Sequence, residues 1–361
     1  MIATRFLELR KRRGLMIALI VVNIGIPTIF LVVRLLAHAF DPKSYGPAGG
    51  YVIFQGLVAG VMYVFGFIVA ATLGCTAGSV DLTDGMFRHL VVTGRSRLSL
   101  YLARIPAGLG VVVPLVAVGF TIVCVVCVFA APTKVSYDGV NVPAGLSKSG
   151  LESWAADHPG LVICDFGFRF NGPGPGPNLP NIPCGPNGPV TIKPGSQGGP
   201  QSTPTHAQLV AAAITIAKQN YPAYAATFLY PSVSLMISSG LWIELEATIG
   251  FMVGLGLASL LGQRTVPVIL LIVLEIVLTP IFARARIPHL INLQRAVVGL
   301  ATDHLAPAGM PVLGGGGGGP GGNGGNLLLI PESRTVAICV IIAWIVGWTV
   351  IGAWRMMTRD A

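Results

Sequence analysis

Six long apolar stretches, separated by polar and glycine-rich segments, dominate the pattern of hydrophobic and polar positions along the chain. Their lengths suit a transmembrane α-helix, which needs about 20 apolar residues to cross a bilayer. We therefore expect an all-α membrane protein with six transmembrane helices. The stretches are residues 15–40, 51–75, 105–131, 241–261, 266–282 and 336–354.

The composition also indicates a membrane protein. Of the 361 residues, 53% are hydrophobic and only 10% are charged, whereas about 25% are charged in typical soluble domains. A soluble protein of this length would need a charged outer surface, so lipid must cover much of this one. The net charge of +9 does not indicate nucleic-acid binding, because the basic residues cluster beside apolar stretches. We expect the lipid bilayer as a partner and no nucleic acid.

The first 14 residues have the pattern of a short amphipathic helix. Ile2, Phe6 and Leu9 recur at helical spacing, while Arg5 and Arg12 occupy other faces. This pattern predicts a helix lying on the membrane surface over residues 1–14, with Arg5, Arg10 and Arg12 as its cationic residues. The alternative is a basic tail that only sets the orientation of the first transmembrane helix.

Basic residues predict which side of the membrane each connection occupies. In the short connections they concentrate on one side, which the positive-inside rule assigns to the cytoplasm. We therefore expect cytoplasmic N- and C-termini, with residues 355–361 as a cytoplasmic tail. Arg284 and Arg286 are exceptions. The residues that follow the rule are Arg5, Arg10, Lys11, Arg12, Arg13, Arg88, Arg95, Arg97, Arg104, Arg264, Arg355 and Arg359.

Two long connections are expected outside the cell. Residues 132–240 are rich in Pro and Gly, a composition from which we expect no compact core. Within them, Thr205 is placed to cap a helix over residues 208–220, and residues 228–241 are expected to pack on the outer membrane face without spanning it. The second connection, residues 283–335, contains the glycine run 314–319, which we expect to be flexible.

The six cysteines fall into two groups. Cys164 and Cys184 share the first outer loop and form a candidate disulfide, provided that the compartment is oxidising. Cys124 and Cys127 form a CxxC, but they lie within an apolar stretch without a second pair of ligands. Buried packing therefore explains them better than redox or zinc chemistry.

Glu275 lies in the middle of the fifth apolar stretch. An acidic residue at membrane depth is costly, so it is a candidate for a functional role such as relaying protons. The alternative is structural: Glu275 stays protonated or pairs within the bundle near Pro280, which already loosens the helix. Glu244 and Glu246 stand beside Trp242 at the start of the predicted fourth span, where a wet interface is the simplest explanation.

The connection between the second and third spans, residues 76–104, is the most informative polar segment. Thr83 or Asp84 is placed to cap a short amphipathic helix, Gly94 to end it, and Ser96 to begin the next helix. The result would be a compact cytoplasmic segment available to a partner. Composition alone leaves a simpler interpretation open, because any connector beside lipid would contain Arg and an interfacial Phe.

This segment resembles the coupling segment of ABC-2-type exporter permeases. An acidic residue is followed by GMFRHL at residues 85–90, GRSR at 94–97 and YLAR at 101–104. Residues 246–251 (EATIGF) and 254–264 (GLGLASLLGQR) are similar to the fourth span of that family, and residues 352–361 (GAWRMMTRDA) to its C-terminal ending. Asp81 or Asp84 stands where the family often has Glu. The Pro/Gly-rich loop is not covered by the resemblance.

The resemblance implies a permease subunit in the plasma membrane that pairs with a second permease chain and docks on ABC ATPase subunits. Members of the family carry drugs, lipids, peptides or polysaccharides, and the resemblance does not select one of these classes. Export is expected. The residues that would couple the permease to the ATPase are Asp81, Asp84, Gly85, Phe87, Arg88, Arg95 and Arg97.

An ATPase would have to be a separate chain. No Lys in the sequence follows a Gly, which excludes the Gly-Lys-Ser/Thr of a phosphate-binding loop. ATP and Mg²⁺ would then be used by the partner, and we expect no cofactor on this chain and no catalytic residues. The six histidines also lack metal-ligand spacing. The alternative function is a proton-coupled secondary transporter that uses Glu275.

Overall fold

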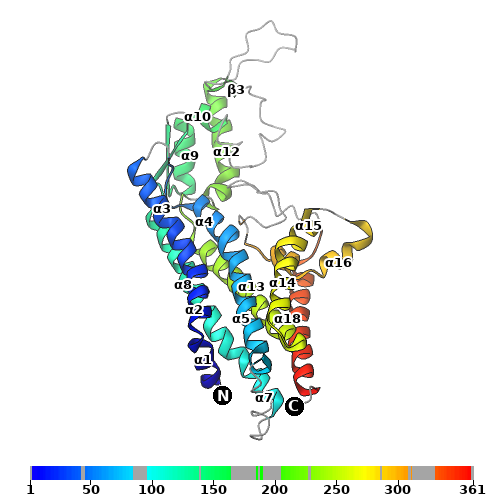
Figure 1. Ribbon diagram of the computed structural model, residues 1–361. Helices are drawn as coiled ribbons and strands as arrows, with labels where there is room; N and C mark the ends of the chain where they lie inside the picture. The colour runs from blue at the N-terminus through cyan, green and yellow to red at the C-terminus, as the bar shows by residue number, and fades with distance from the viewer. Residues whose placement is uncertain are drawn as a thin grey trace.

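Six long helices run side by side in the computed structural model (Figure 1), and each is long and apolar enough to cross a membrane. The six spans are Arg13–Phe40, Tyr51–Val80, Arg97–Phe129, Val233–Leu261, Thr265–Ala283 and Arg334–Thr358. The structure describes residues 2–41, 45–83, 96–137, 140–163, 184–185, 188–189, 205–226, 229–284, 287–307, 310 and 330–358. The expected six helices of membrane-spanning length are confirmed.

Four of the six described spans are built from more than one helical segment, and the fourth and sixth are single helices. In order from the first span to the sixth, the segments are α2 (Arg13–Ile20), η1 (Val21–Gly25) and α3 (Ile26–Phe40); α4 (Tyr51–Leu57), η2 (Val58–Tyr63) and α5 (Val64–Thr83); α7 (Arg97–Leu102) and α8 (Arg104–Phe129); α13 (Val233–Leu261); α14 (Thr265–Ile272), η4 (Val273–Leu278) and α15 (Thr279–Arg284); and α18 (Arg334–Thr358). Helix α1 (Ile2–Lys11) precedes them.

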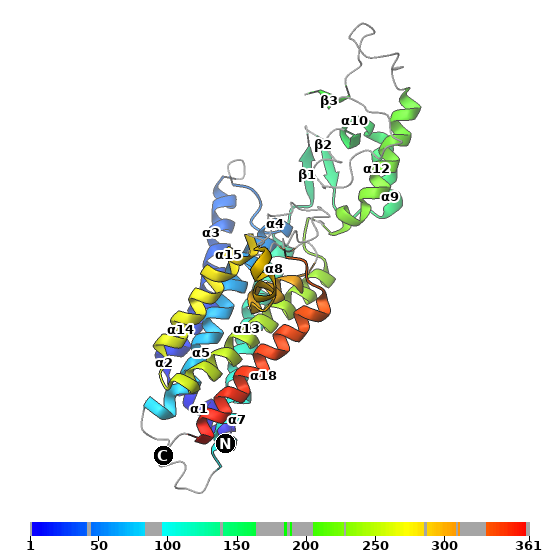
Figure 2. The same cartoon turned by 90° about the vertical axis from the view of Figure 1, so that its right-hand side faces the viewer.

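Both chain termini lie at the same end of the bundle, which we call the terminal end (Figures 1 and 2). Helices α1 and α7 lie at this end too. At the opposite end, the loop end, the chain between the third and fourth spans forms a separate folded region.

The η1, η2 and η4 segments are π-helical. Two of them end two residues before a proline: Pro27 follows η1, and Pro280 follows η4. A proline has no N–H to donate to the preceding turn, so the helix widens there. At the end of η4 the Leu274 carbonyl oxygen accepts from both the amide and the hydroxyl of Thr279, the hydroxyl at 3.0 Å.

Helix α13 lies at the centre of the bundle and packs against α5, α8 and α18. Its contact with α5 depends on glycine. A β-carbon at Gly254 would lie 2.5 Å from the Ala71 carbonyl oxygen, and one at Gly250 would lie 2.8 Å from that of Phe67. The absence of these β-carbons lets the two backbones approach closely, as small residues do in other membrane helix pairs.

The fourth span begins earlier than the sequence analysis predicted. Ser232 caps α13, its hydroxyl accepting from the Leu235 amide at 3.2 Å, and the helix continues without a break to Leu261. Residues 233–241, expected to pack on the membrane face as a separate segment, are therefore the first turns of the span. The error matters because it misplaced Glu246.

The loop-end region has its own hydrophobic core. A hairpin of β1 (Lys134–Tyr137) and β2 (Val140–Pro143) precedes α9 (Lys148–Asp157), α10 (Pro159–Leu161) and α12 (His206–Ala226). The short strands β3 (Cys184–Gly185) and β4 (Gly188–Pro189) also pair. The buried core residues are Val142, Leu151, Ala155, Val162, Ala213, Ile216, Ala217 and Tyr224. The expectation of no compact core was wrong for these residues.

The predicted helix after Thr205 is present as α12. The Thr205 hydroxyl accepts from the Gln208 amide at 3.4 Å, and the Gln208 side chain accepts from the Thr205 amide at 2.8 Å. This reciprocal pair is a capping box, which satisfies two amides that have no partner within the helix.

Part of the second long connection folds back onto the bundle. It contains η5 (Pro288–Leu290), α16 (Ile291–Arg295) and α17 (Val298–His304), whose residues 298–303 are all buried. Trp344 in α18 donates its ring N–H to the Ala296 carbonyl oxygen at 2.8 Å. The glycine run 314–319 lies outside the described residues.

Candidate functional site

Helix α1, the predicted surface helix, packs against the start of α8 at the terminal end. Arg5 and Leu9 are buried in this contact, while Arg10 is exposed. Arg5 forms an ion pair with Glu8, with 2.8 Å between Nη1 and Oε2. The helical prediction for these residues is therefore confirmed, and one of its three cationic residues is buried rather than solvated.

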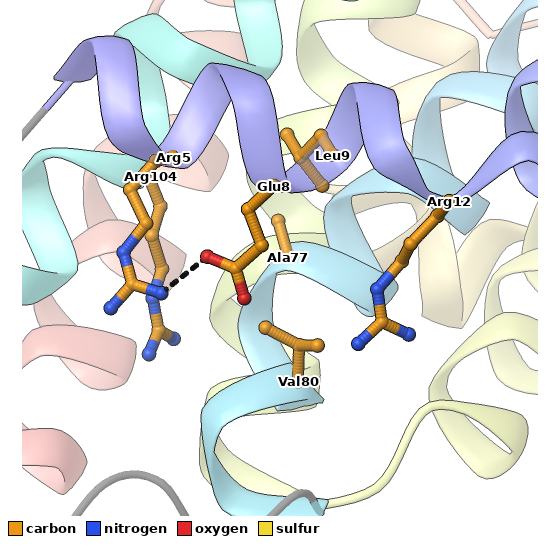
Figure 3. A pocket seen from close by; sticks show the side chains of 7 residues that line it. All are labelled: Arg5, Glu8, Leu9, Arg12, Ala77, Val80 and Arg104. Atoms are coloured by element: carbon orange, nitrogen blue, oxygen red, sulfur yellow. Dashed lines mark hydrogen bonds and ion pairs between the residues drawn. The ribbon is translucent and has the colours of Figure 1, made fainter. Parts of the chain in front are cut away.

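A pocket lies between α1, α5 and α8 (Figure 3). The Arg5 and Arg104 guanidinium groups lie on one side of Glu8 and Arg12 on the other, above the small side chains of α5. The residues lining this pocket are Arg5, Glu8, Leu9, Arg12, Ala77, Val80 and Arg104.

The carbonyl oxygen of Gly78 joins three spans at the terminal end. It accepts a hydrogen bond at 3.0 Å from Nη1 of Arg104 and one at 3.4 Å from the Ser259 hydroxyl. Arg104 is buried, at 2% exposed. Arg104 belongs to α8, Ser259 to α13 and Gly78 to α5. A charged group holds a backbone carbonyl more strongly than a neutral one does, so this carbonyl fixes the terminal ends of three helices together.

Most of the predicted ATPase-coupling residues lie outside the described residues. These are Asp84, Gly85, Phe87, Arg88 and Arg95, and only the backbone of Asp81 is described. The candidate cap of the short helix at Asp84 and its end at Gly94 also fall there. Their coupling role stays a prediction.

The far end of the coupling segment is described and is tied to the last span. Ser96 caps α7 as predicted, its hydroxyl accepting from the Ser99 amide at 3.2 Å. Arg97, the next residue, donates from Nη1 to the Met357 carbonyl oxygen in α18 at 3.1 Å. One turn farther, the Tyr101 ring packs on Gly352, where a β-carbon would lie 2.5 Å from its hydroxyl.

A second polar group lies inside the bundle, towards the loop end. Glu246 from α13, Glu275 from η4 and Asp303 from α17 are each at most 1% exposed. The carboxyl groups of Glu275 and Asp303 both lie near that of Glu246, so the three carboxyl groups form one cluster. We call these three residues the acidic cluster.

Hydroxyl groups and one tryptophan surround the acidic cluster. The Tyr63 hydroxyl lies 2.9 Å from that of Thr302 and 3.3 Å from Oδ1 of Asp303. The Tyr63 ring stacks on Trp242 with 4.4 Å between centroids, and Trp242 donates its ring N–H to the Thr302 carbonyl oxygen at 2.9 Å. Among the described residues, no group of three or more His, Cys, Asp or Glu side chains is arranged to hold a metal ion.

Two π-helical segments place residues in this region. Segment η2 ends at Tyr63, and η4 contains Glu275. The π-turn changes the direction of the side chains that follow it, and such turns are frequent at functional sites. Glu275 also lies against the backbone of α17, because a β-carbon at Gly299 would be 2.7 Å from its Oε2.

Only Glu275 of this cluster was singled out from the sequence. Glu246 was assigned to a wet interface, which was wrong: it is near the middle of the 29-residue α13 and is 1% exposed. Asp303 was not considered, because it lies in a connection rather than in an apolar stretch. Burial raises the pKa of Asp303 well above its ordinary value, and the nearby Glu275 carboxyl adds to the rise, while the Tyr63 hydroxyl opposes it.

Cys124 and Cys127 lie in a membrane-spanning helix, as predicted. Cys127 is buried and Cys124 half-buried in α8, and both are free thiols packed against the hydrophobic core. Cys164 and the side chain of Cys184 lie outside the described residues, so the disulfide stays a prediction.

Comparison with known proteins finds no match to the chain among protein families, curated proteins or solved structures.

Proposed function

We propose that this chain is the membrane-spanning permease subunit of an ATP-driven exporter. The observation that carries the proposal is the joint at the terminal end, where α7 is tied to α18 through Arg97 and Met357. The same end holds α1 packed on α8, and the Gly78 carbonyl group joining α5, α8 and α13. Force applied at residues 84–95, between α5 and α7, would therefore reach the ends of several spans.

The orientation of the chain supports a partner at this joint. The terminal end contains the basic residues that the positive-inside rule places in the cytoplasm, including Arg10, Arg97 and Arg355. ATP is a cytoplasmic substrate, so an ATPase would dock at the terminal end. We propose the plasma membrane as the location.

The transport path would lie between two such chains. Exposed apolar side chains cover α3, α14 and α18, and include Ile29, Ile269 and Ile342. Lipid and a second permease chain both suit such surfaces.

The test is an ATPase assay with the purified chain and a candidate ABC ATPase, such as one encoded beside its gene. We expect the two proteins to co-purify and the permease in lipid vesicles to change a vanadate-sensitive rate of ATP hydrolysis. Phe87→Ala and Arg88→Ala would abolish that change, whereas Lys218→Ala, at the loop end, would preserve it. A chain that binds no ATPase, or a rate unaffected by both coupling variants, would contradict the proposal.

The second candidate is a proton-coupled secondary transporter, and the acidic cluster is the observation that favours it. Glu275 does not face lipid but meets Glu246 and Asp303 inside the bundle. Buried acidic groups in membrane helices commonly mark proton or ion pathways. The two candidates differ in their energy source: transport that continues without any ATPase and stops when the proton gradient is collapsed identifies the second.

A further inference from the structure

The acidic cluster places three carboxyl groups in a region that water does not reach. Glu275 and Asp303 are 0% exposed and Glu246 is 1% exposed. Ionised carboxylates are strongly disfavoured in such surroundings, and neighbouring carboxylates disfavour one another's ionisation further. The hydrogen bonds around the cluster show how little of this cost the structure offsets.

One of these hydroxyl groups contacts Asp303. The Tyr63 hydroxyl donates to Oδ1 of Asp303 at 3.3 Å and lies 2.9 Å from the Thr302 hydroxyl, which donates to the Gly299 carbonyl oxygen at 2.9 Å. A long hydrogen bond from a neutral hydroxyl offsets little of the cost of a buried charge. The contact therefore positions Asp303 without making its ionised form favourable.

Glu275 is compensated even less. The Thr279 hydroxyl lies 3.0 Å from the Leu274 carbonyl oxygen and 3.5 Å from Oε2 of Glu275. Oε1 of Glu275 is buried and has no hydrogen-bond partner among the described residues. One contact at 3.5 Å does not offset the burial of a carboxylate.

The surroundings of Glu246 give independent evidence from the same region. It enters from α13, and neither of its carboxyl oxygens has a hydrogen-bond partner among the described residues. The neighbouring hydroxyl of Thr302 is already engaged by Tyr63 and Gly299. An ionised carboxylate with no donor at this depth would be strongly unfavourable, so Glu246 requires a proton or a cation. The described acidic, His and Cys side chains provide no arrangement for a metal ion.

We propose that Glu246, Glu275 and Asp303 form a proton-binding site that is fully protonated in this conformation. The Tyr63 hydroxyl contacts the carboxyl group of Asp303, and the Thr279 hydroxyl contacts that of Glu275. A movement of α17 or of the fifth span that admits water would let the carboxyl groups ionise, so proton release follows that movement. The site deepens the second candidate function but does not need it, because an ATP-driven permease can contain the same site.

Infrared spectroscopy of the purified chain tests the proposal directly. A protonated carboxyl group has a C=O band distinct from that of a carboxylate, and the band shifts when the sample is prepared in heavy water. At neutral pH we expect deuterium-sensitive carboxyl bands in the unaltered protein. Asp303→Asn, Glu275→Gln and Glu246→Gln should each remove one component. Glu152→Gln should remove none, because Glu152 pairs with Lys218 at 3.7 Å and is partly exposed.

A second variant keeps the test decisive if a carboxyl substitution prevents folding. Tyr63→Phe retains the ring but removes the hydroxyl group that contacts Asp303, so it should move the Asp303 band and leave that of Glu275 in place. An unaltered protein without protonated carboxyl bands would overturn the proposal, as would bands unaffected by every cluster variant. The spectra need no ATPase and no proton gradient, so their outcome is separate from the tests of both proposed functions.

Discussion

Arg97 donates a hydrogen bond from Nη1 to the Met357 carbonyl oxygen at 3.1 Å, across 260 residues of sequence. Met357 is in the last turn of α18, whose final carbonyl groups have no partner within the helix. A guanidinium group at a helix C-terminus is doubly favourable, since it satisfies such a carbonyl and complements the helix dipole. The residue that begins α7 is thus attached to the end of the sixth span.

Arg97→Ala tests whether this attachment transmits force. Because the hydrogen bond is exposed, its loss should cost only about 0.5–1.5 kcal/mol of stability. If α7 moves α18, the variant should still bind an ATPase but lose most of its effect on the rate of hydrolysis. Arg334→Ala, at the opposite end of α18, is the matched control and should behave like the unaltered chain. Equal ATPase rates with Arg97→Ala and Arg334→Ala would contradict the role of Arg97.

The packing of α5 on α13 predicts different effects for two glycines. Gly254→Ala should destabilise the chain by about 1–3 kcal/mol, because the added methyl group would overlap the Ala71 carbonyl group. A β-carbon added at Gly66, in α5, would meet no atom within 4 Å. Gly66→Ala should therefore be neutral or stabilise by up to about 1 kcal/mol through helix propensity. Thermal unfolding in detergent measures both, and similar losses for the two variants would show that the contact does not depend on Gly254.

Tyr63→Phe isolates the hydroxyl group from the ring. The ring should still stack on Trp242, but Thr302 and Asp303 lose a hydrogen-bond partner in a buried site. We expect a loss of about 1–3 kcal/mol, the usual cost of leaving buried polar groups unsatisfied. Tyr45→Phe provides the control, since that side chain is 53% exposed. A midpoint of thermal unfolding equal to that of the control would show that the Tyr63 hydroxyl contributes nothing to the cluster.

Local signals in the sequence predicted much of the fold. The apolar stretches located all six spans, and Ser96 and Thr205 marked the starts of α7 and α12 because capping depends on residues close in sequence. The start of α13 was missed because Ser238, Ser239 and Gly240 interrupt its apolar run. Small residues of this kind are tolerated in a membrane helix that packs closely against others.

The acidic cluster was harder to predict because its members come from distant elements. Glu275 stood out, since a single acidic residue in an apolar stretch is visible in one window of sequence. Asp303 lies in a connection, and only the folding of α17 onto the bundle buries it. Glu246 was misassigned with the start of its helix. Hydrophobic periodicity gives no signal for the π-turn that ends at Tyr63, whereas Pro280 marks the one that contains Glu275.

Asp303 predicts a specific dependence of stability on pH. Its pKa is raised by burial and by the nearby Glu275, so the folded chain binds this proton more tightly than the unfolded chain. The resulting stability is complete below the ordinary pKa of Asp and is lost as pH rises through the folded value. Unfolding midpoints measured from about pH 4 to pH 8 should therefore fall as pH rises. Asp303→Asn should flatten this slope, because the amide oxygen can accept the same hydrogen bond from Tyr63 but the amide does not ionise. Part of the slope should remain, since burial also raises the pKa of Glu332. A slope unchanged in Asp303→Asn would show that Asp303 binds its proton equally in both states.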